Sequence, residues 1–289
     1  IFNMTKMEGL YPILAMPFDQ NGKIDLEDLE NEVEYGIDEG IDGIGLAFGS
    51  EIIKLTDVER NIVTTSIVNQ AKNRVPIVIN TGAHSTFAAV EYSKQAEKDG
   101  ADAIMCLPPP GLPSKAIENY FSEIDSNVGI PIFIQDAGNS PIPENLGKLL
   151  SEKCTNISYA KIETQPPATR VKNWIDSCGE TMSIFGGASG TFILEELSSG
   201  SKGTMPHFGY IPMFRKVIDL FKNNLLSEAE QEFNKYASVF RCDLPQLYMT
   251  KEILKRRGVF KHSYMREPTS PPNKNSWNDF IGKYEKLLG

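Results

Sequence analysis

Short apolar runs alternate with longer amphipathic stretches along most of the chain. Eight runs are typical of buried strands, at Tyr11–Met16, Gly43–Ala47, Pro76–Asn80, Ala103–Leu107, Pro131–Gln135, Ser158–Ile162, Ser183–Phe185 and Gly203–Met205. Helical periodicity fills the intervals, at Leu26–Gly40, Asp57–Lys72, Thr86–Asp99, Ile117–Asn127, Glu144–Glu152, Ala168–Ser177 and Thr191–Leu197. Nearly continuous apolar strands separated by helices predict parallel β-α-β units covered on both faces.

Eight such units can close into a barrel, and an open doubly wound sheet is the alternative. No GxGxxG loop follows the first run, where the sequence is Met16-Pro17-Phe18-Asp19-Gln20-Asn21-Gly22. The count of eight therefore favours an α/β fold of the (β/α)8 TIM-barrel type over residues 9–224. Beyond it, residues 225–289 are expected to form a C-terminal helical segment packed on the barrel. Its expected helices are Glu228–Phe240, Leu244–Arg257 and a last short one after a linker at Glu267–Ser276.

Residue types at the helix boundaries agree with this division. Thr56 and Ser85 are suited to cap the second and third helices, because a hydroxyl can accept a free amide of the first turn. Gly40, Gly100 and Gly179 follow helical stretches, where a left-handed residue is commonly required.

Composition excludes several classes of protein. A net charge of −9 is the opposite of the basic face that a nucleic-acid binder needs. No apolar run reaches the ~20 residues of a membrane span, so a cytoplasmic location is the default expectation. Because a natural chain rarely begins with Ile1, residues 1–8 are expected to be disordered or foreign to the natural protein. The cysteines have no metal-like spacing and are expected to be free thiols, at Cys106, Cys154, Cys178 and Cys242.

Lys161 is the residue that most needs an explanation, because it lies in an otherwise apolar strand. Strand alternation places Tyr159, Lys161 and Glu163 on one face, which would point into the barrel. A desolvated lysine has a lowered pKa, and its free amine can attack a ketone to form an imine. Two other interpretations are a lysine that reaches solvent at the strand end and one that is permanently paired with Glu163.

Three small, polar loops follow strands, at 48–51, 81–86 and 186–190. In barrel enzymes the site lies on this face, and glycine-rich backbone there can bind a carboxylate or phosphate. Gly49, Ser50 and Gly187 are the candidate carboxylate-binding residues, whereas ordinary turn chemistry is the alternative for any single loop. His84 and Gln135 also belong to strand-end segments. No metal-ligand spacing is present, and no cofactor is expected because a protonated imine is itself an electron sink.

These residues resemble the dihydrodipicolinate synthase/N-acetylneuraminate lyase family of class I aldolases and dehydratases. The resemblance runs from Gly9 to about Phe260. It includes the motifs Ala15-Met16-Pro17-Phe18-Asp19, Gly49-Ser50-Glu51, Leu55-Thr56, Glu59-Arg60, Thr81-Gly82-Ala83-His84-Ser85-Thr86, Pro131-Ile132-Phe133-Ile134 and Ala160-Lys161-Ile162-Glu163. It implies a (β/α)8 barrel with a C-terminal helical segment, a homo-oligomer (dimer or tetramer), and Lys161 as the imine-forming residue.

The sequence departs from the family pattern at several functional positions. The tyrosine that ends the family's fifth strand is replaced by Gln135, and its usual Pro-Tyr-Tyr loop is Pro108-Pro109-Pro110. The arginine expected soon afterwards is absent from 138–141. These departures argue against the lysine-biosynthetic reaction, and Ile134-Gln135-Asp136-Ala137 with Lys161-Ile162-Glu163-Thr164 looks more like the 2-keto-3-deoxy-L-arabinonate dehydratase branch.

The sequence therefore predicts a lyase that binds a small 2-keto acid and dehydrates a 2-keto-3-deoxy sugar acid. In this hypothesis Lys161 and Gln135 belong to the catalytic group, and Gly49, Ser50, His84, Glu163 and Gly187 bind substrate. Aldol cleavage or a synthase reaction through the same imine is the first alternative. The second is a non-catalytic barrel that binds a small acid.

Overall fold

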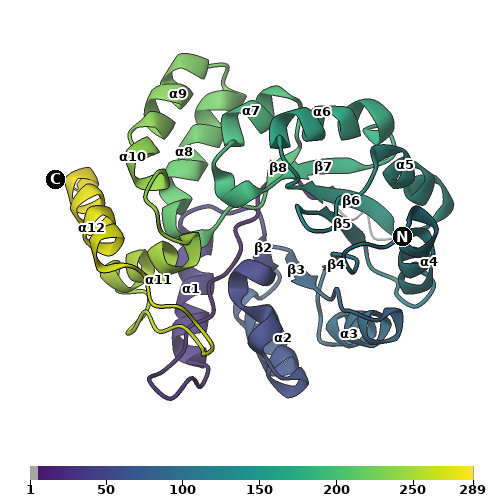
Figure 1. Ribbon diagram of the computed structural model, residues 1–289, viewed down its shortest axis with the longest axis horizontal. Helices are drawn as coiled ribbons and strands as arrows, with labels where there is room; N and C mark the ends of the chain where they lie inside the picture. Colours follow the sequence, from purple (N-terminus) through teal and green to yellow (C-terminus); the bar gives the residue numbers. More distant parts are fainter. Residues whose placement is uncertain (1–5, 289) are drawn as a thin grey trace.

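A parallel eight-stranded sheet forms the centre of the computed structural model, which describes residues 6–288 (Figure 1). The strand order is β1-β8-β7-β6-β5-β4-β3-β2. Their bounds are β1 Gly9–Leu10, β2 Ile44–Leu46, β3 Ile77–Asn80, β4 Ala103–Cys106, β5 Ile132–Asp136, β6 Ile157–Ile162, β7 Ser183–Gly186 and β8 Gly203–Thr204. The Leu14 N–H donates to the Gly45 carbonyl (2.9 Å), and the Gly45 N–H donates to Pro12 (3.0 Å). These bonds join the two ends of the sheet and confirm the (β/α)8 barrel.

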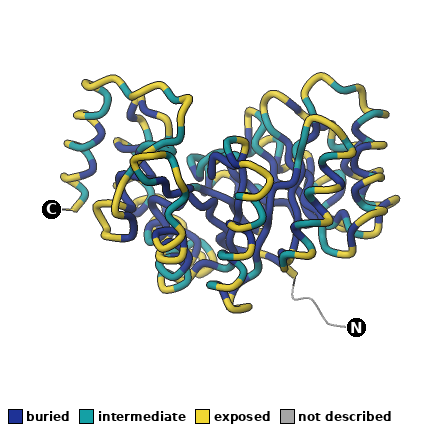
Figure 2. The backbone as a smooth tube through the Cα atoms, turned by 90° about the horizontal axis from the view of Figure 1, so that it is seen from below, coloured by how far each residue is buried: buried dark blue, intermediate teal, exposed yellow. Residues whose placement is uncertain are grey.

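One helix follows each strand and covers the outside of the sheet. Their bounds are α1 Leu26–Asp38, α2 Asp57–Ala71, α3 Thr86–Lys98, α4 Ser114–Asp125, α5 Glu144–Lys153, α6 Pro167–Cys178, α7 Ile193–Ser198 and α8 Ile211–Lys222. Figure 2 shows the buried strands at the centre and exposed turns around them. Thr56 and Ser85 cap α2 and α3 as predicted. Gly40 and Gly100 are left-handed, but Gly179 is not (φ −64°).

The first strand is shorter and earlier than the predicted Tyr11–Met16. On the β8 side the bonds continue past Leu10, since the Tyr11 N–H donates to the Thr204 carbonyl (2.9 Å) and the Ile13 N–H donates to the Pro206 carbonyl (2.7 Å). Pro12 faces β2 and has no N–H to donate there, so pairing on that side is reduced to an isolated bridge between Ile13 and Gly45. The expectation of disorder before residue 9 is wrong for Met7, which is buried and donates its N–H to the Tyr159 hydroxyl (3.0 Å). Residues 1–5 lie outside the described residues.

Aromatic side chains fill the barrel interior. Phe133 stacks on Tyr159 with ring centroids 4.5 Å apart, and Phe185 meets Phe133 edge-on at 5.4 Å. Tyr11 and Met205 belong to the same buried cluster. Tyr159 thus points inward, which is the side that strand alternation predicts for it and for Lys161 two residues later.

The C-terminal segment is helical and packs against the barrel. It contains α9 Leu226–Asn234, α10 Ala237–Phe240, α11 Gln246–Arg256 and α12 Lys274–Leu288. The predicted helix Glu228–Phe240 is therefore two helices. The last helix begins at Lys274, inside the predicted linker Glu267–Ser276, and its 15 residues make it longer than the short helix predicted. In the described part of the chain, no helix is long and apolar enough to span a membrane.

Candidate active site

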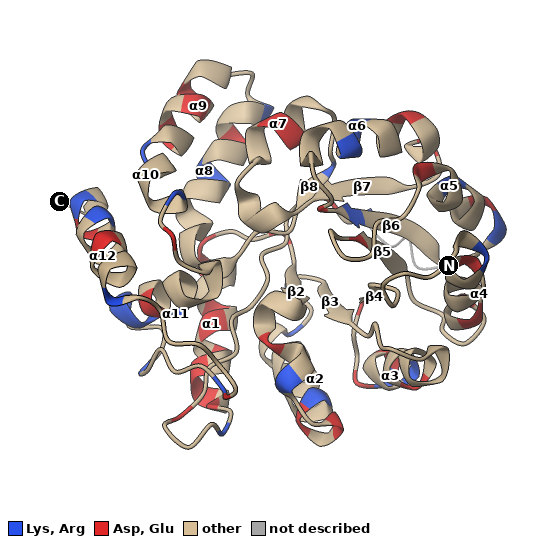
Figure 3. Ribbon diagram, viewed as in Figure 1, with Lys and Arg blue, Asp and Glu red and all other residues tan. Residues whose placement is uncertain are grey.

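Lys161 lies inside the mouth of the barrel, near the carboxyl end of β6. It is 4% exposed, and it is the one charged residue of that strand, visible as the blue segment of β6 in Figure 3. Its register partners are Gln135 on β5 and Phe185 on β7. The structure excludes a lysine that reaches solvent. It shows an ion pair instead, with Nζ 3.1 Å from Glu163 Oε1.

Glu163 connects the lysine to two neighbouring elements. Its Oε2 accepts from Gln135 Nε2 (2.8 Å), and its Oε1 accepts from the Ala188 N–H after β7 (3.1 Å). The carboxylate is 19% exposed, so it lies at the edge of the buried region. A carboxylate held by three donors is positioned to exchange a proton with the lysine amine or with a group bound to it.

Asn80 is a member of this network that the sequence did not single out. Its Nδ2 donates to Gln135 Oε1 (3.0 Å), and its Oδ1 accepts from the Gly82 N–H (3.2 Å). The polar chain therefore runs from Lys161 through Glu163 and Gln135 to the loop after β3. The sequence feature that could have identified Asn80 as a site residue is its position at the carboxyl end of a predicted strand.

Gly187 lies directly against the lysine. A Cβ atom at this position would lie 2.7 Å from Lys161 Cε and 2.8 Å from Glu163 Cγ, closer than real Cβ contacts. The absence of a side chain is therefore required for the lysine and the glutamate to occupy their positions. This contact brings the predicted loop 186–190 to the site.

Gly49 and Ser50 lie in a short 3-10 helix after β2 and are close to the loop after β7. Gly49 and Ser189 line one cavity of about 70 Å³, together with His207 and Thr250. Ser50 is fully buried, and its Oγ accepts from the Ala47 N–H (3.1 Å). No hydrogen bond joins Ser50 to Lys161 within residues 6–288, so its hydroxyl holds the loop in the structure described here.

A buried ion pair with α11 also holds the loop after β2 in place. Glu51 has a left-handed backbone (φ 55°), and its Oε1 lies 2.5 Å from Nζ of Lys251 on α11. Lys251 is completely buried and also donates to the Tyr264 carbonyl (2.8 Å). Desolvation lowers the pKa of Lys251 to about 8, although Glu51 acts in the opposite direction. Lys251 could not be recognised from local sequence patterns, because its partner Glu51 is 200 residues away.

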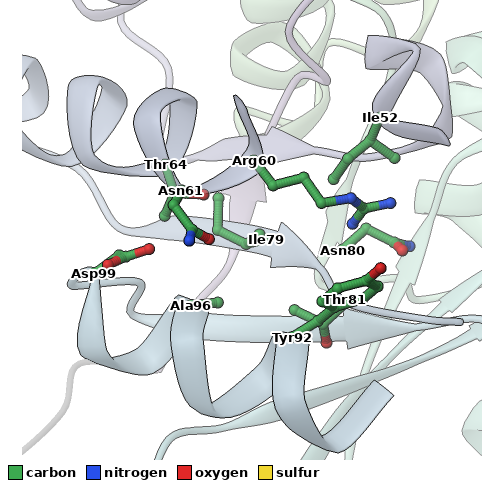
Figure 4. Close-up of a pocket in the computed structure, with 10 residues that line it drawn as sticks. All are labelled: Ile52, Arg60, Asn61, Thr64, Ile79, Asn80, Thr81, Tyr92, Ala96 and Asp99. Atoms are coloured by element: carbon green, nitrogen blue, oxygen red, sulfur yellow. The ribbon is translucent and has the colours of Figure 1, made fainter. Parts of the chain in front are cut away.

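His84 is apart from this network. It is exposed and lines a cavity of about 640 Å³ with Gly82, Arg60 and Asn139. Lys161 is not among the residues that line this cavity. Figure 4 shows Arg60 extending from α2 over the end of β3, where Asn80 and Thr81 lie. The predicted substrate-binding role of His84 is thus not supported by a contact with the lysine.

The site contains an amine, a carboxylate and two amides in a buried network. Gln135 cannot titrate, so Glu163 is the ionisable group in contact with Lys161. Among residues 6–288, no group of three or more His, Cys, Asp or Glu side chains has the arrangement of a metal site. The buried lysine lies at the carboxyl ends of the strands, which is the face where α/β-barrel enzymes have their active sites.

The chain belongs to the dihydrodipicolinate synthetase family, whose model matches residues 6–282. This membership agrees with the resemblance seen in the sequence. It is 25% identical over 271 residues to an L-2-keto-3-deoxyarabonate dehydratase from Azospirillum brasilense, covering 90% of this chain and 88% of the relative. It is 30% identical over 206 residues to a 4-hydroxy-tetrahydrodipicolinate synthase from Methanococcus maripaludis, covering 69% of each.

Solved structures share the fold. The 4-hydroxy-tetrahydrodipicolinate synthase from Methylacidiphilum fumariolicum SolV superposes with a TM-score of 0.91 at 24% identity, covering 98% of this chain and 96% of that one. YagE from E. coli K12, solved in complex with pyruvate, superposes with a TM-score of 0.89 at 18% identity, covering 98% and 99%.

Proposed function

We propose that Lys161 forms an imine with the C2 carbonyl of a small 2-keto acid, and that the protein is a class I lyase. The observation that carries the proposal is the position of this amine, which is 4% exposed at the barrel mouth and paired with one carboxylate. Imine formation joins Nζ to C2 and releases the keto oxygen as water. Glu163 can accept and return the protons that these steps require.

The reaction we propose is dehydration of a 2-keto-3-deoxy sugar acid. The protonated imine withdraws electrons from C3, so a base can remove a C3 proton. The electron pair of that C–H bond then forms a C3–C4 double bond, and the C4 hydroxyl leaves as water after it accepts a proton. The 25% identity to a named dehydratase over 90% of this chain supports this choice. Gly49, Ser50 and Gly187 are the candidates for holding the substrate carboxylate.

Carbon–carbon bond cleavage or formation through the same imine is the second candidate. The relative from Methanococcus maripaludis is named as a synthase, and the YagE structure contains pyruvate. Gln135 and Pro108-Pro109-Pro110 stand where the family usually has tyrosines, which weighs against the synthase reaction. A non-catalytic acid-binding barrel would retain the fold without turnover.

Borohydride trapping tests the imine. The protein is incubated with pyruvate, 2-ketoglutarate or a C5 or C6 2-keto-3-deoxy acid, reduced, and analysed by peptide mass spectrometry. We expect a reduced adduct on the peptide that contains Lys161, and complete loss of that adduct in Lys161→Ala. Lys202→Ala, which removes an exposed lysine just before β8, is the matched control and should retain the adduct.

The products separate the candidate reactions. Water loss without pyruvate release supports dehydration, whereas pyruvate release supports carbon–carbon cleavage. Absence of an adduct with every acid of the panel would contradict the imine. Unchanged ligand affinity in Lys161→Ala, combined with no turnover in the unmodified protein, would indicate the binding-only barrel.

A further inference from the structure

The loop after β7 has a strained backbone. Ala188, Ser189 and Gly190 are all left-handed, with φ of 42°, 58° and 79°. Only the last is a glycine, and a left-handed backbone is unfavourable for residues with a Cβ atom. Such a conformation persists where its surroundings hold it in place. Gly187 immediately precedes the strained residues and lies against Lys161. The contacts that hold this loop therefore also determine the position of Lys161.

The loop is held from the side of the active site by Glu163. The Ala188 N–H donates to Glu163 Oε1 (3.1 Å), the oxygen that is also paired with Lys161. Gly187 packs on the lysine Cε and the glutamate Cγ. A displacement of Gly187 or Ala188 would therefore alter the position of both side chains.

Glu196 of α7 holds the loop from the opposite side. It is completely buried, and within residues 6–288 no donor has hydrogen-bond geometry to either of its carboxyl oxygens, although the Gly187 amide lies close enough to favour the ionised form. Its Oε2 would lie only 1.8 Å from a Cβ atom at Gly186. Thr204, the register partner of Gly186 on β8, is also buried, and its hydroxyl likewise has no described partner. A carboxylate in this setting would be strongly destabilised, so the geometry favours a neutral acid.

We infer that Glu196 is a positioning residue for Lys161. In its protonated form it packs against Gly186 and holds the loop 186–190 against the lysine, and its ionisation displaces that loop. Glu163 contacts the loop on the side that faces Lys161, and Glu196 contacts it on the opposite side. The catalytic part of this inference rests on the proposed function of Lys161, whereas the structural part does not.

The electrostatic surroundings agree with a neutral Glu196. Burial raises its pKa to about 8, and Glu163 and Glu195 act in the same direction. The Gly187 amide and Lys161 partly oppose this increase in the pKa. Glu196 is therefore expected to be largely protonated at pH 7 and to ionise above about pH 8.

The first experiment measures the rate of adduct formation on Lys161 from pH 6 to pH 10. In the unmodified protein the rate should fall above about pH 8. Glu196→Gln keeps the shape of the side chain but cannot ionise, so it should retain the rate at pH 7 and lose this alkaline decrease. Glu195→Gln changes the adjacent, exposed residue of the same helix and removes one charge that raises the pKa of Glu196, so it should keep the alkaline decrease and move it to a slightly lower pH. An identical alkaline decrease in Glu196→Gln would overturn the inference.

The second experiment does not depend on the proposed function. An unfolded glutamate ionises near pH 4.5, and Glu196 ionises near pH 8 in the folded protein. Between these values the folded state binds more protons, so the unmodified protein loses stability as the pH rises. The Tm of Glu196→Gln minus that of the unmodified protein should increase from pH 5 to pH 8. A constant difference would contradict a protonated Glu196.

Hydrogen exchange provides a test without a variant. Protection of the amides in residues 186–191, corrected for the intrinsic pH dependence of exchange, should decrease above about pH 8 in the unmodified protein. Unchanged protection from pH 7 to pH 9 would overturn the inference. Absence of an adduct with any keto acid, combined with the expected Tm and exchange results, would reject the proposed function and leave the role of Glu196 in the loop intact.

Discussion

At the scale of single residues, the site depends on the absence of a side chain at Gly187 as well as on the side chains of Lys161 and Glu163. Gly187 leaves room for Lys161 and Glu163, and no larger residue could occupy its position without displacing them. Gln135 stands where the family usually has an ionisable tyrosine, and its amide forms hydrogen bonds to Glu163 and Asn80. The chemistry is thereby concentrated on one amine and one carboxylate.

Gly187→Ala should slow adduct formation on Lys161 by roughly tenfold to a hundredfold, because a shift of the reacting group by about 1 Å is enough for such a loss. The measurement is the rate of borohydride-trapped adduct. Gly138→Ala, in an exposed loop where a Cβ atom meets nothing within 4 Å, is the control and should retain the rate. Equal rates in both variants would show that the close contact at Gly187 does not position the lysine.

Much of this site could be predicted from residue types, but not all of it. Lys161 was recognisable as a charge in an apolar strand, and strand alternation placed it with Glu163. His84 was included because it belongs to a strand-end loop, yet an exposed loop histidine can point away from the barrel axis. Glu196 was not distinguishable from Glu195, because a helix of six residues has too short a pattern to show which of two adjacent acids is buried.

At the scale of elements, α11 and the loop after β2 act as one unit. The Lys251–Glu51 pair joins them, and Lys251 also lies 4.7 Å from the ring centroid of Phe18. Arg266 adds a further connection, since it is paired with Glu59 at 2.7 Å and donates to the Gly22 carbonyl. The C-terminal segment therefore stabilises the loop that contains Gly49 and Ser50.

Lys251→Met should destabilise the protein by roughly 3 kcal/mol, because it leaves Glu51 buried with Lys54 as its remaining ionic partner. Keto-acid affinity should fall as well, since the loop loses its support. Urea denaturation measures the first effect and ligand titration the second. Lys255→Met, one turn further along α11 and half exposed, should change stability by less than about 1 kcal/mol. A similar cost for both variants would contradict the structural role of the buried pair.

The element pattern was predictable because each β-α unit repeats the same alternation of apolar and amphipathic residues. Errors arose where local chemistry interrupts a ladder or a helix. Pro12 cannot donate to β2, so pairing at that end of the sheet is irregular. The stretch at Lys235 and Tyr236 divides the predicted helix Glu228–Phe240. Contacts between residues far apart in the chain, such as Lys251–Glu51, cannot be predicted from the local pattern of apolar and polar residues.

At the scale of the whole molecule, the barrel presents exposed apolar side chains near the cavity on its carboxyl-end face. Ile53 lines that cavity and is 69% exposed, and Phe87 on α3 is 79% exposed. Apolar side chains that form one large patch mark subunit contacts, whereas single ones are ordinary on a protein surface. The homo-oligomer therefore stays a prediction from the family resemblance, and Phe87 is the exposed residue chosen to test it.

Light scattering after size-exclusion chromatography should therefore give a mass of two or four times 32.1 kDa. Phe87→Asp should lower that mass or weaken the assembly, because it places a charge in the expected contact. Leu226→Asp, which changes an exposed apolar residue on α9, is the control and should leave the mass unchanged. A monomeric mass for the unmodified protein would refute the expectation.

The pairing of Glu51 with Lys251 also has a consequence for biosynthesis. During translation, the strands that close the barrel all leave the ribosome before residue 251 does. The nascent chain can therefore complete its sheet while the second loop still lacks its support. Competence to bind a keto acid should consequently be acquired late, only after α11 has emerged and docked.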